Sequence, residues 1–190
     1  MKRNSGFILE VYKDKRTVFT FNDLGLLLGE SDKDKLKQKV NYYVRNNMIL
    51  NIRKGIYAKE NYNPEELACK IFTPAYLSLE YVLQKAGAIF QYSGKFTLVS
   101  YLSRSIKVGN NIFDYRRIKE PVLINTTGIN RLPDDINIAS PERAFLDILY
   151  LDKEFYLDNP AALDKKKIIS ILPVYNSRAL DERVRKYISD

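Results

Sequence analysis

The sequence predicts an α+β fold with an N-terminal winged helix-turn-helix domain over residues 1–62. A second, mixed α/β domain with a largely antiparallel sheet is expected over residues 63–190. Three observations favour this division. A basic amphipathic helix runs straight into a short hairpin within Asp32–Lys59. The composition changes at the polar, proline-ended segment Asn61–Pro64. β-type segments then dominate residues 88–138, between stretches with helical spacing.

The first domain follows the winged-helix order of helix, strand, helix, turn, helix and hairpin. Thr20 or Asn22 is expected to cap the second helix, and Gly29 suits its C-terminal end. Asn46 and Asn47 end the third helix, and Lys54-Gly55 forms the hairpin turn. The expected elements are helices Ser5–Lys13, Asp23–Leu28 and Lys33–Asn46, and strands Thr17–Phe21, Ile49–Arg53 and Ile56–Lys59.

The third helix has one apolar face, which Leu36, Val40, Tyr43 and Val44 define at helical spacing. The opposite face is polar. Its amide and guanidinium groups are of the kind that pair with base edges in a major groove, and flanking lysines suit phosphates. We therefore expect DNA contacts from Lys35, Lys37, Gln38, Lys39, Asn41, Tyr42 and Arg45 of the helix, and from Arg53 and Lys54 of the hairpin.

The positive charge is concentrated in the first domain. Residues 1–62 contain 13 Lys/Arg against 7 Asp/Glu, a balance of +6, whereas the whole chain carries +8. The remaining residues are thus nearly neutral. A basic segment that coincides with the predicted helix and hairpin indicates a polyanion partner, and we expect double-stranded operator DNA.

The chain contains no histidine and a single cysteine, Cys69. Triads that depend on histidine and His/Cys zinc sites are therefore excluded, and no catalytic residue, metal or cofactor is expected. No internal disulfide can form, and Glu10, Lys13 and Asp14 interrupt the apolar run that a signal peptide would need. No apolar stretch reaches the length of a membrane span. We expect a cytoplasmic protein that is not an enzyme.

The second domain is expected to begin with two helices, Pro64–Phe72 and Leu79–Ala86, the latter capped by Ser78 and ended by Gly87. β-type segments and three further helices follow. The expected strands are Ala88–Tyr92, Phe96–Tyr101, Ser105–Val108, Ile112–Ile118 and Val122–Asn125; the expected helices begin at Ser140 and cover Leu163–Ile171 and Ser177–Ile188.

The helix after Ser140 carries a candidate polar site, formed by Glu142, Arg143 and Asp147. Ser140 and Pro141 already have the chemistry of a helix start, at the N-cap and the first helical position. Arg143 and Asp147 are four residues apart, as in an ordinary helical ion pair. A structural role is therefore the favoured interpretation of these residues.

Three segments, Lys54–Tyr57, Pro74–Leu79 and Ile138–Leu149, occur in the same order and spacing as in a known family. With them the chain resembles the AbiEi-type antitoxins of type IV toxin–antitoxin systems, which are linked to abortive infection by phage. The similarity extends over residues 20–151. It implies a winged-helix domain that binds operator DNA and represses its own operon. It also implies a C-terminal domain that counters a nucleotidyltransferase-like toxin without forming a stable complex with it.

Two other functions are compatible with the sequence. A nuclease would hold Mg²⁺ with Asp134, Asp135 and Glu142 beside a basic groove, although Asp134 and Asp135 resemble a surface turn. A winged helix can also serve as a protein-interaction module. Bacterial repressors usually read inverted repeats as dimers, so a homodimer on DNA is compatible with the main interpretation.

Overall fold

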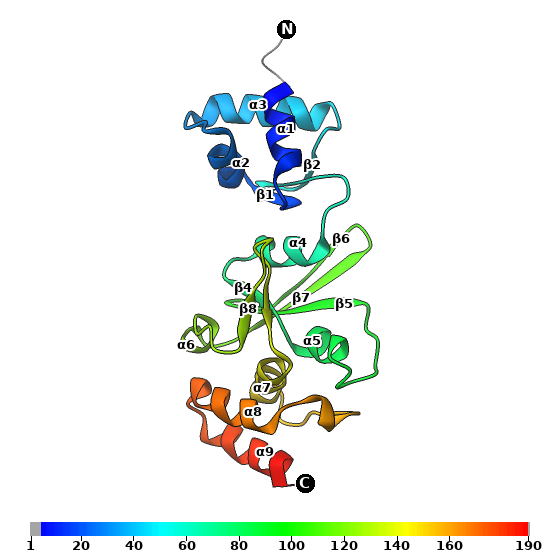
Figure 1. Ribbon diagram of the computed structural model, residues 1–190, viewed down its shortest axis with the longest axis vertical. Helices are drawn as coiled ribbons and strands as arrows, with labels where there is room; N and C mark the ends of the chain where they lie inside the picture. The colour runs from blue at the N-terminus through cyan, green and yellow to red at the C-terminus, as the bar shows by residue number, and fades with distance from the viewer. Residues whose placement is uncertain (1–4, 190) are drawn as a thin grey trace. The chain divides into compact units, whose positions relative to one another are not determined.

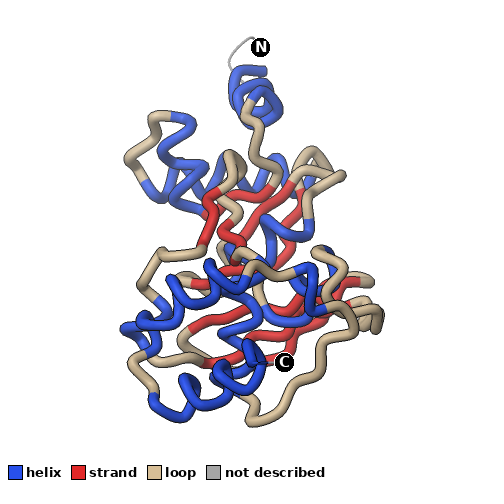
Figure 2. The backbone as a smooth tube through the Cα atoms, turned by 60° about the horizontal axis from the view of Figure 1, so that its bottom comes forward, coloured by secondary structure: helices blue, strands red, loops and turns tan. Residues whose placement is uncertain are grey.

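The computed structural model describes residues 5–189, which form an α+β fold of two compact units (Figure 1). The first unit extends to Ile71 and the second begins at Phe72. Among the described residues, the strands form a three-stranded sheet in the first unit and a six-stranded sheet in the second. Figure 2 distinguishes the helices, strands and loops of both units by colour.

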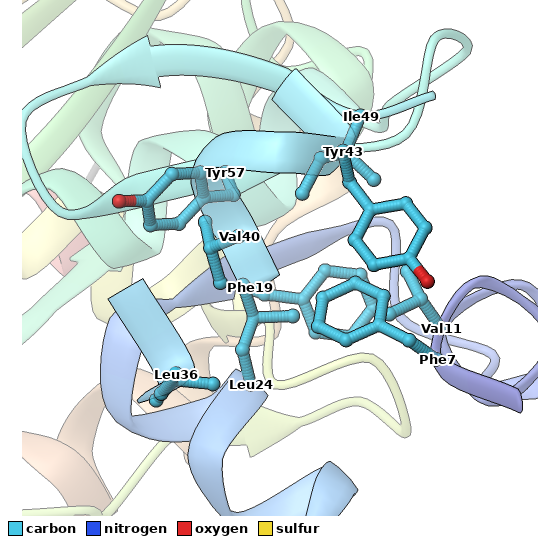
Figure 3. Close-up of a cluster of buried hydrophobic side chains, with 9 residues drawn as sticks. All are labelled: Phe7, Val11, Phe19, Leu24, Leu36, Val40, Tyr43, Ile49 and Tyr57. Carbon is cyan, nitrogen blue, oxygen red and sulfur yellow. The ribbon is translucent and has the colours of Figure 1, made fainter. Parts of the chain in front are cut away.

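The first unit packs its helices on a small antiparallel sheet of order β1-β3-β2. Figure 3 shows the buried cluster that joins them, in which Phe7 of the first helix stacks on Tyr43 of the third with ring centroids 4.1 Å apart. The elements of this unit are α1 (Ser5–Lys13), β1 (Val18–Thr20), α2 (Phe21–Leu28), α3 (Lys33–Arg45), β2 (Leu50–Arg53), β3 (Ile56–Ala58) and α4 (Pro64–Ile71).

Helix α4 packs with the first unit, although the sequence suggests a division before it, at residues 62 and 63. The cause is a polar contact that joins distant parts of the chain. The buried carboxylate of Glu66 accepts hydrogen bonds from the backbone N–H groups of Thr17 and Val18, at 2.7 and 2.8 Å, and from the Thr17 hydroxyl. Lys70 adds an ion pair to Asp23 at 3.2 Å. The start of β1 therefore fixes α4.

The second unit contains a mixed sheet of order β6-β7-β5-β4-β9-β8. Three of its pairings are antiparallel and two are parallel, namely β5 with β7 and β4 with β9. The strands are β4 (Ala75–Leu77), β5 (Lys95–Ser100), β6 (Arg104–Val108), β7 (Asn111–Arg117), β8 (Ile129–Arg131) and β9 (Asn137–Ala139).

Helices α5 and α7 contact each other and the sheet, and α8 and α9 in turn cover α7 (Figure 1). Helix α7 is buried over most of its length as a result. The helical elements are α5 (Leu79–Lys85), α6 (Glu120–Leu123), α7 (Pro141–Leu151), α8 (Lys165–Ile171), α9 (Arg178–Ser189) and the short 3₁₀ turns η1 (Pro160–Ala162) and η2 (Leu172–Tyr175).

Two predicted strands were wrong. Residues 88–92 are irregular because their backbone bonds to a neighbouring loop: Asn159 N–H donates to Ala88 O at 3.0 Å, and the Phe90 N–H donates to the Asp158 carboxylate at 2.7 Å. Residues 122–125 follow Glu120-Pro121, which begins the helical turn α6, and Val122 and Leu123 are buried there. The short strands β4, β8 and β9, by contrast, lie outside the predicted strands.

Candidate nucleic-acid interface

Helix α3 is positioned by well-formed caps on both sides of the turn that precedes it. Thr20 and Asp23 form a capping box at the start of α2, and Gly29 ends that helix with φ of +60°, a value that glycine adopts without strain. Asp32 then caps α3 by accepting hydrogen bonds from the N–H groups of Asp34 and Lys35, at 3.0 and 3.1 Å. The turn between the helices is therefore closely defined.

Close packing also fixes the approach of α2 to α3. A Cβ added to Gly25 would lie 3.1 Å from Leu36 Cδ2 and 3.4 Å from the carbonyl oxygen of Glu30. The Leu36 side chain would have to shift by a few tenths of an ångström to make room for this Cβ. Gly25 thus allows close packing of α2 against the start of α3.

The two faces of α3 differ as the sequence predicts. Leu36, Val40 and Tyr43 are buried against the unit. The ring of Tyr42, 47% exposed, stands edge-on to that of Tyr43 at 5.3 Å. The residues expected to read bases are all exposed and lie along one face of the helix: Gln38, Asn41, Tyr42 and Arg45.

Some basic residues of α3 form ion pairs with nearby carboxylates, and others do not. Lys39 lies 2.7 Å from the carboxylate of Glu30, and Lys35 lies 3.6 Å from that of Asp32. The hydrogen bond from Lys39 lowers the pKa of Glu30. Within residues 5–189, Lys37 and Arg45 form no ion pair, so their charges are available to an anionic partner.

Lys54 and Arg53 lie apart from the α3 face, at the end of the β2–β3 hairpin. Lys54 is exposed and precedes Gly55, whose φ is +79°. Arg53 is partly buried next to a register shift in the hairpin. The carbonyl of Gly55 accepts a hydrogen bond from Phe21 N–H at 3.0 Å, which ties the turn to the beginning of α2.

Lys33, the first residue of α3, was missed in the sequence analysis. It is exposed, and no ion pair involves it within the described part of the chain. The sequence pattern that marks Lys33 as a candidate DNA contact was present, because Lys33 begins the same run of alternating lysines and directly follows the capping Asp32. Glu30, the partner of Lys39, lacks such a signal, since it lies nine residues earlier in a turn.

A second polar cluster occupies the core of the second unit, where the sequence suggests a structural pair. Arg143 and Asp147 are fully buried, with Nε and Oδ1 3.3 Å apart. Asp147 also accepts hydrogen bonds from the hydroxyls of Tyr175, Ser78 and Tyr76, at 2.6, 2.7 and 3.2 Å. Burial raises the pKa of Asp147, and the donors around it oppose that shift.

The guanidinium of Arg143 is similarly saturated. It donates to the carbonyls of Val122 and Thr127, at 2.7 and 2.9 Å, and to the Tyr76 hydroxyl at 3.1 Å. Ser140 caps α7 as predicted, accepting from the N–H of Arg143. Ser78, in contrast, makes no capping hydrogen bond to α5: its hydroxyl donates to Asp147, and the N–H of Tyr81 donates to Thr97 Oγ1 instead. The cluster binds α7 to β4 and to the loop around α6.

The acidic residues considered for a magnesium site are not brought together. Across residues 5–189 there is no group of three or more His, Cys, Asp or Glu side chains that would hold a metal ion. Glu142 is buried on α7 and accepts a hydrogen bond from the N–H of Asp164 at 3.3 Å. Asp135 pairs with Arg131 at 3.3 Å in the loop between β8 and β9.

None of the described helices is long and apolar enough to cross a membrane. No known protein family matches the chain, and no curated protein is similar to it. Among solved structures, the RV2827C protein from Mycobacterium tuberculosis has a similar fold, with a TM-score of 0.54 at 14% sequence identity. The similarity covers 95% of this chain and 74% of that one. At this identity it concerns the fold alone.

Proposed function

We propose that the chain is a DNA-binding transcriptional repressor that places α3 in the major groove of double-stranded operator DNA. The observation that carries the proposal is the face of α3: an exposed row of amide, tyrosine and guanidinium side chains, opposite a buried apolar face and behind a tightly capped turn. Such a helix is the reading element of helix-turn-helix proteins.

The arrangement of the first unit supports a winged helix. Its order is α1-β1-α2-α3-β2-β3, and β1 pairs with β3 in the same sheet as the hairpin. In this interpretation the β2–β3 hairpin is the wing, and Lys54 and Arg53 contact the backbone of the duplex. The base contacts belong to Gln38, Asn41, Tyr42 and Arg45, and the phosphate contacts of the helix to Lys35, Lys37 and Lys39.

The antitoxin role is a separate part of the proposal and rests on the resemblance of the sequence to AbiEi-type antitoxins. In this role the chain represses its own operon in the cytoplasm and counters a nucleotidyltransferase-like toxin without a stable complex. The second unit would act against the toxin. Two observations test this directly: a nucleotidyltransferase-like reading frame next to the gene, and recovery of growth when the chain is produced together with that protein.

The DNA-binding part is tested by selecting duplexes from a random library with the full chain and measuring their affinity by fluorescence anisotropy. A preferred sequence should emerge. The logarithm of the binding constant should fall by about 0.9 per phosphate contact for each tenfold increase in salt concentration. Inverted repeats in the selected duplexes would indicate a homodimer on DNA. Failure to retain any duplex at low salt would refute the proposal and favour a protein-interaction module. Cleavage of the duplex only in the presence of magnesium would favour the alternative function, a metal-dependent nuclease.

A further inference from the structure

A cleft of about 810 Å³ opens in the second unit where two parallel neighbours of the sheet end. Strand β5 ends at Ser100 and β7 at Arg117, so the cleft lies at their carboxyl ends. Its lining comes from the end of β7, from the residues that follow β5 and β7, from α6 and Ile124, and from Pro74 and Tyr150. Ligands of open α/β sheets characteristically bind outside the carboxyl ends of parallel strands, and this volume is typical of small-molecule sites.

The cleft presents two cations whose charges are not used inside the protein. Arg117 and Lys119 are exposed on its lining, and within the described residues neither side chain forms an ion pair or hydrogen bond. Their backbone is nevertheless fixed: the N–H of Arg117 donates to Ser103 Oγ and that of Ile118 to the carbonyl of Ser100, at 3.0 and 3.1 Å. Two cations that are unpaired among the described residues, at a cleft, favour an anionic ligand such as a phosphate.

Aromatic and apolar side chains form the rest of the wall. Tyr101 is 48% exposed, and its ring is held edge-on by Phe72 at 6.4 Å, which itself packs on Tyr115 at 4.9 Å. Ile124 is 64% exposed on the same lining, and Tyr150 contributes a second ring. An exposed tyrosine held by an edge-on ring contact, on the same lining as two cations, is suited to stacking a planar heterocycle.

Glu120 is the acidic group of the cleft. It is exposed, and its side chain has no partner among residues 5–189. On the same lining as two cations and an aromatic wall, a carboxylate suits the hydroxyl groups of a ribose, as acidic residues do in dinucleotide sites. The lining therefore matches each part of a ribonucleotide with a complementary group.

We propose that this cleft binds a ribonucleotide, with the base against Tyr101, the ribose hydroxyls on Glu120 and the phosphate on Arg117 and Lys119. The proposal is independent of DNA binding by the first unit. All the residues that line the cleft belong to the second unit, and none lies on the α3 face.

The test is calorimetric titration of the full chain with the four ribonucleoside monophosphates, with ATP and GTP, and with inorganic phosphate. At least one nucleotide should bind at one site per chain. Replacing a residue that binds the phosphate (Arg117→Gln or Lys119→Gln) or the residue that stacks on the base (Tyr101→Ala) should lower the affinity for that nucleotide by about tenfold. Glu120→Gln should remove the preference for the ribonucleotide over its 2′-deoxy form. Unchanged thermal midpoints would establish that the variants fold.

Two control variants sharpen the test. Lys107→Gln removes an exposed lysine of β6 outside the cleft and should leave the affinity unchanged. Arg45→Ala, on α3, should also leave it unchanged, which separates this site from the DNA-binding face. Absence of binding by all the nucleotides, equal binding of inorganic phosphate, or full affinity in Arg117→Gln and Tyr101→Ala would overturn the proposal.

Discussion

The ammonium group of Lys39 lies 2.7 Å from the carboxylate of Glu30, across the turn that connects α2 and α3. The ion pair engages the ammonium group of Lys39, although the side chain remains 49% exposed. Lys39 therefore has to leave Glu30, or share it, before it binds a phosphate. If α3 binds DNA as we propose, Glu30 should limit the affinity of this face for any duplex.

Glu30→Gln should strengthen binding to an unselected duplex. The gain should be about two- to fivefold at low salt, because an exposed ion pair is worth about 0–1 kcal/mol and its loss frees Lys39. Fluorescence anisotropy of the full chain measures the change. Glu60→Gln is the matched control, since it changes the net charge equally at an exposed position outside α3. If Glu30→Gln and Glu60→Gln increased the affinity for the duplex equally, the change in net charge alone would explain the effect.

Lys37→Ala and Lys54→Ala should weaken all duplexes alike and flatten the salt dependence. Each lost phosphate contact reduces the slope by about 0.9, because fewer counterions are released. The measurement is the dissociation constant at four or five salt concentrations. Lys107→Ala, an exposed lysine of β6, provides the control. If the slope of the salt dependence were unchanged in both Lys37→Ala and Lys54→Ala, neither lysine would contact a phosphate.

Asp23→Asn should destabilise the first unit at neutral pH, by about 1 kcal/mol as for a lost helix cap. Burial opposes ionisation of Asp23, but the hydrogen bonds from Thr20 and the charge of Lys70 outweigh it and lower the pKa of Asp23. A lowered pKa stabilises the fold above the unfolded pKa of about 3.9. The difference between the two proteins should therefore shrink as the pH falls below about 4. Urea unfolding of both proteins across pH 3–7 measures this difference in stability. A difference that grew as the pH fell would contradict the prediction.

Ser78→Ala should destabilise the second unit by about 1–3 kcal/mol, since it leaves the buried carboxylate of Asp147 with one donor fewer. Chemical unfolding of the full chain measures the loss. Ser105→Ala, at an exposed position of β6, should have little effect. If both substitutions cost the same, the buried hydroxyl of Ser78 would contribute nothing specific to the cluster.

Gly128→Ala should be more destabilising than Gly109→Ala, although both glycines have positive φ, +76° and +57°. At Gly128 the new Cβ would lie 2.9 Å from Ile171 Cδ1 and 3.0 Å from Arg143 Cβ, whereas nothing lies within 4 Å at Gly109. The additional cost should be about 1–3 kcal/mol, as for an overpacked core. Thermal unfolding compares the two variants directly, and equal midpoints would contradict the packing argument.

Elements with strong local signals were predictable from the sequence. Helix α1 has the predicted bounds, Ser5–Lys13, because its apolar spacing is regular and its surroundings are polar. The cap at Ser140 was also predicted, and Thr20 was one of the two candidates for the cap of α2, since each cap depends on residues within three positions. The exposed and buried faces of α3 followed from the same short-range periodicity.

Features that depend on distant residues were not predictable. Strand β4 has only three residues, and it pairs with residues 98–100 of β5 and with Ile138 of β9, both distant in the sequence. The sequence suggested the Arg143–Asp147 pair, but the hydroxyls that complete it come from residues far along the chain in either direction. In α6, the apolar run that resembles a strand is overridden by the helix-starting Glu120-Pro121.

The most direct test of the central claim is the affinity of Asn41→Ala for the duplex selected by the wild-type chain, measured beside an unselected duplex. The substitution changes no charge, so it isolates base recognition from phosphate binding. We predict a loss of about 1–3 kcal/mol on the selected duplex and almost none on the other. Asn130→Ala, an exposed asparagine on edge strand β8, should change neither. Equal affinity of Asn41→Ala and the wild-type chain for the selected duplex would contradict the placement of α3 in the groove.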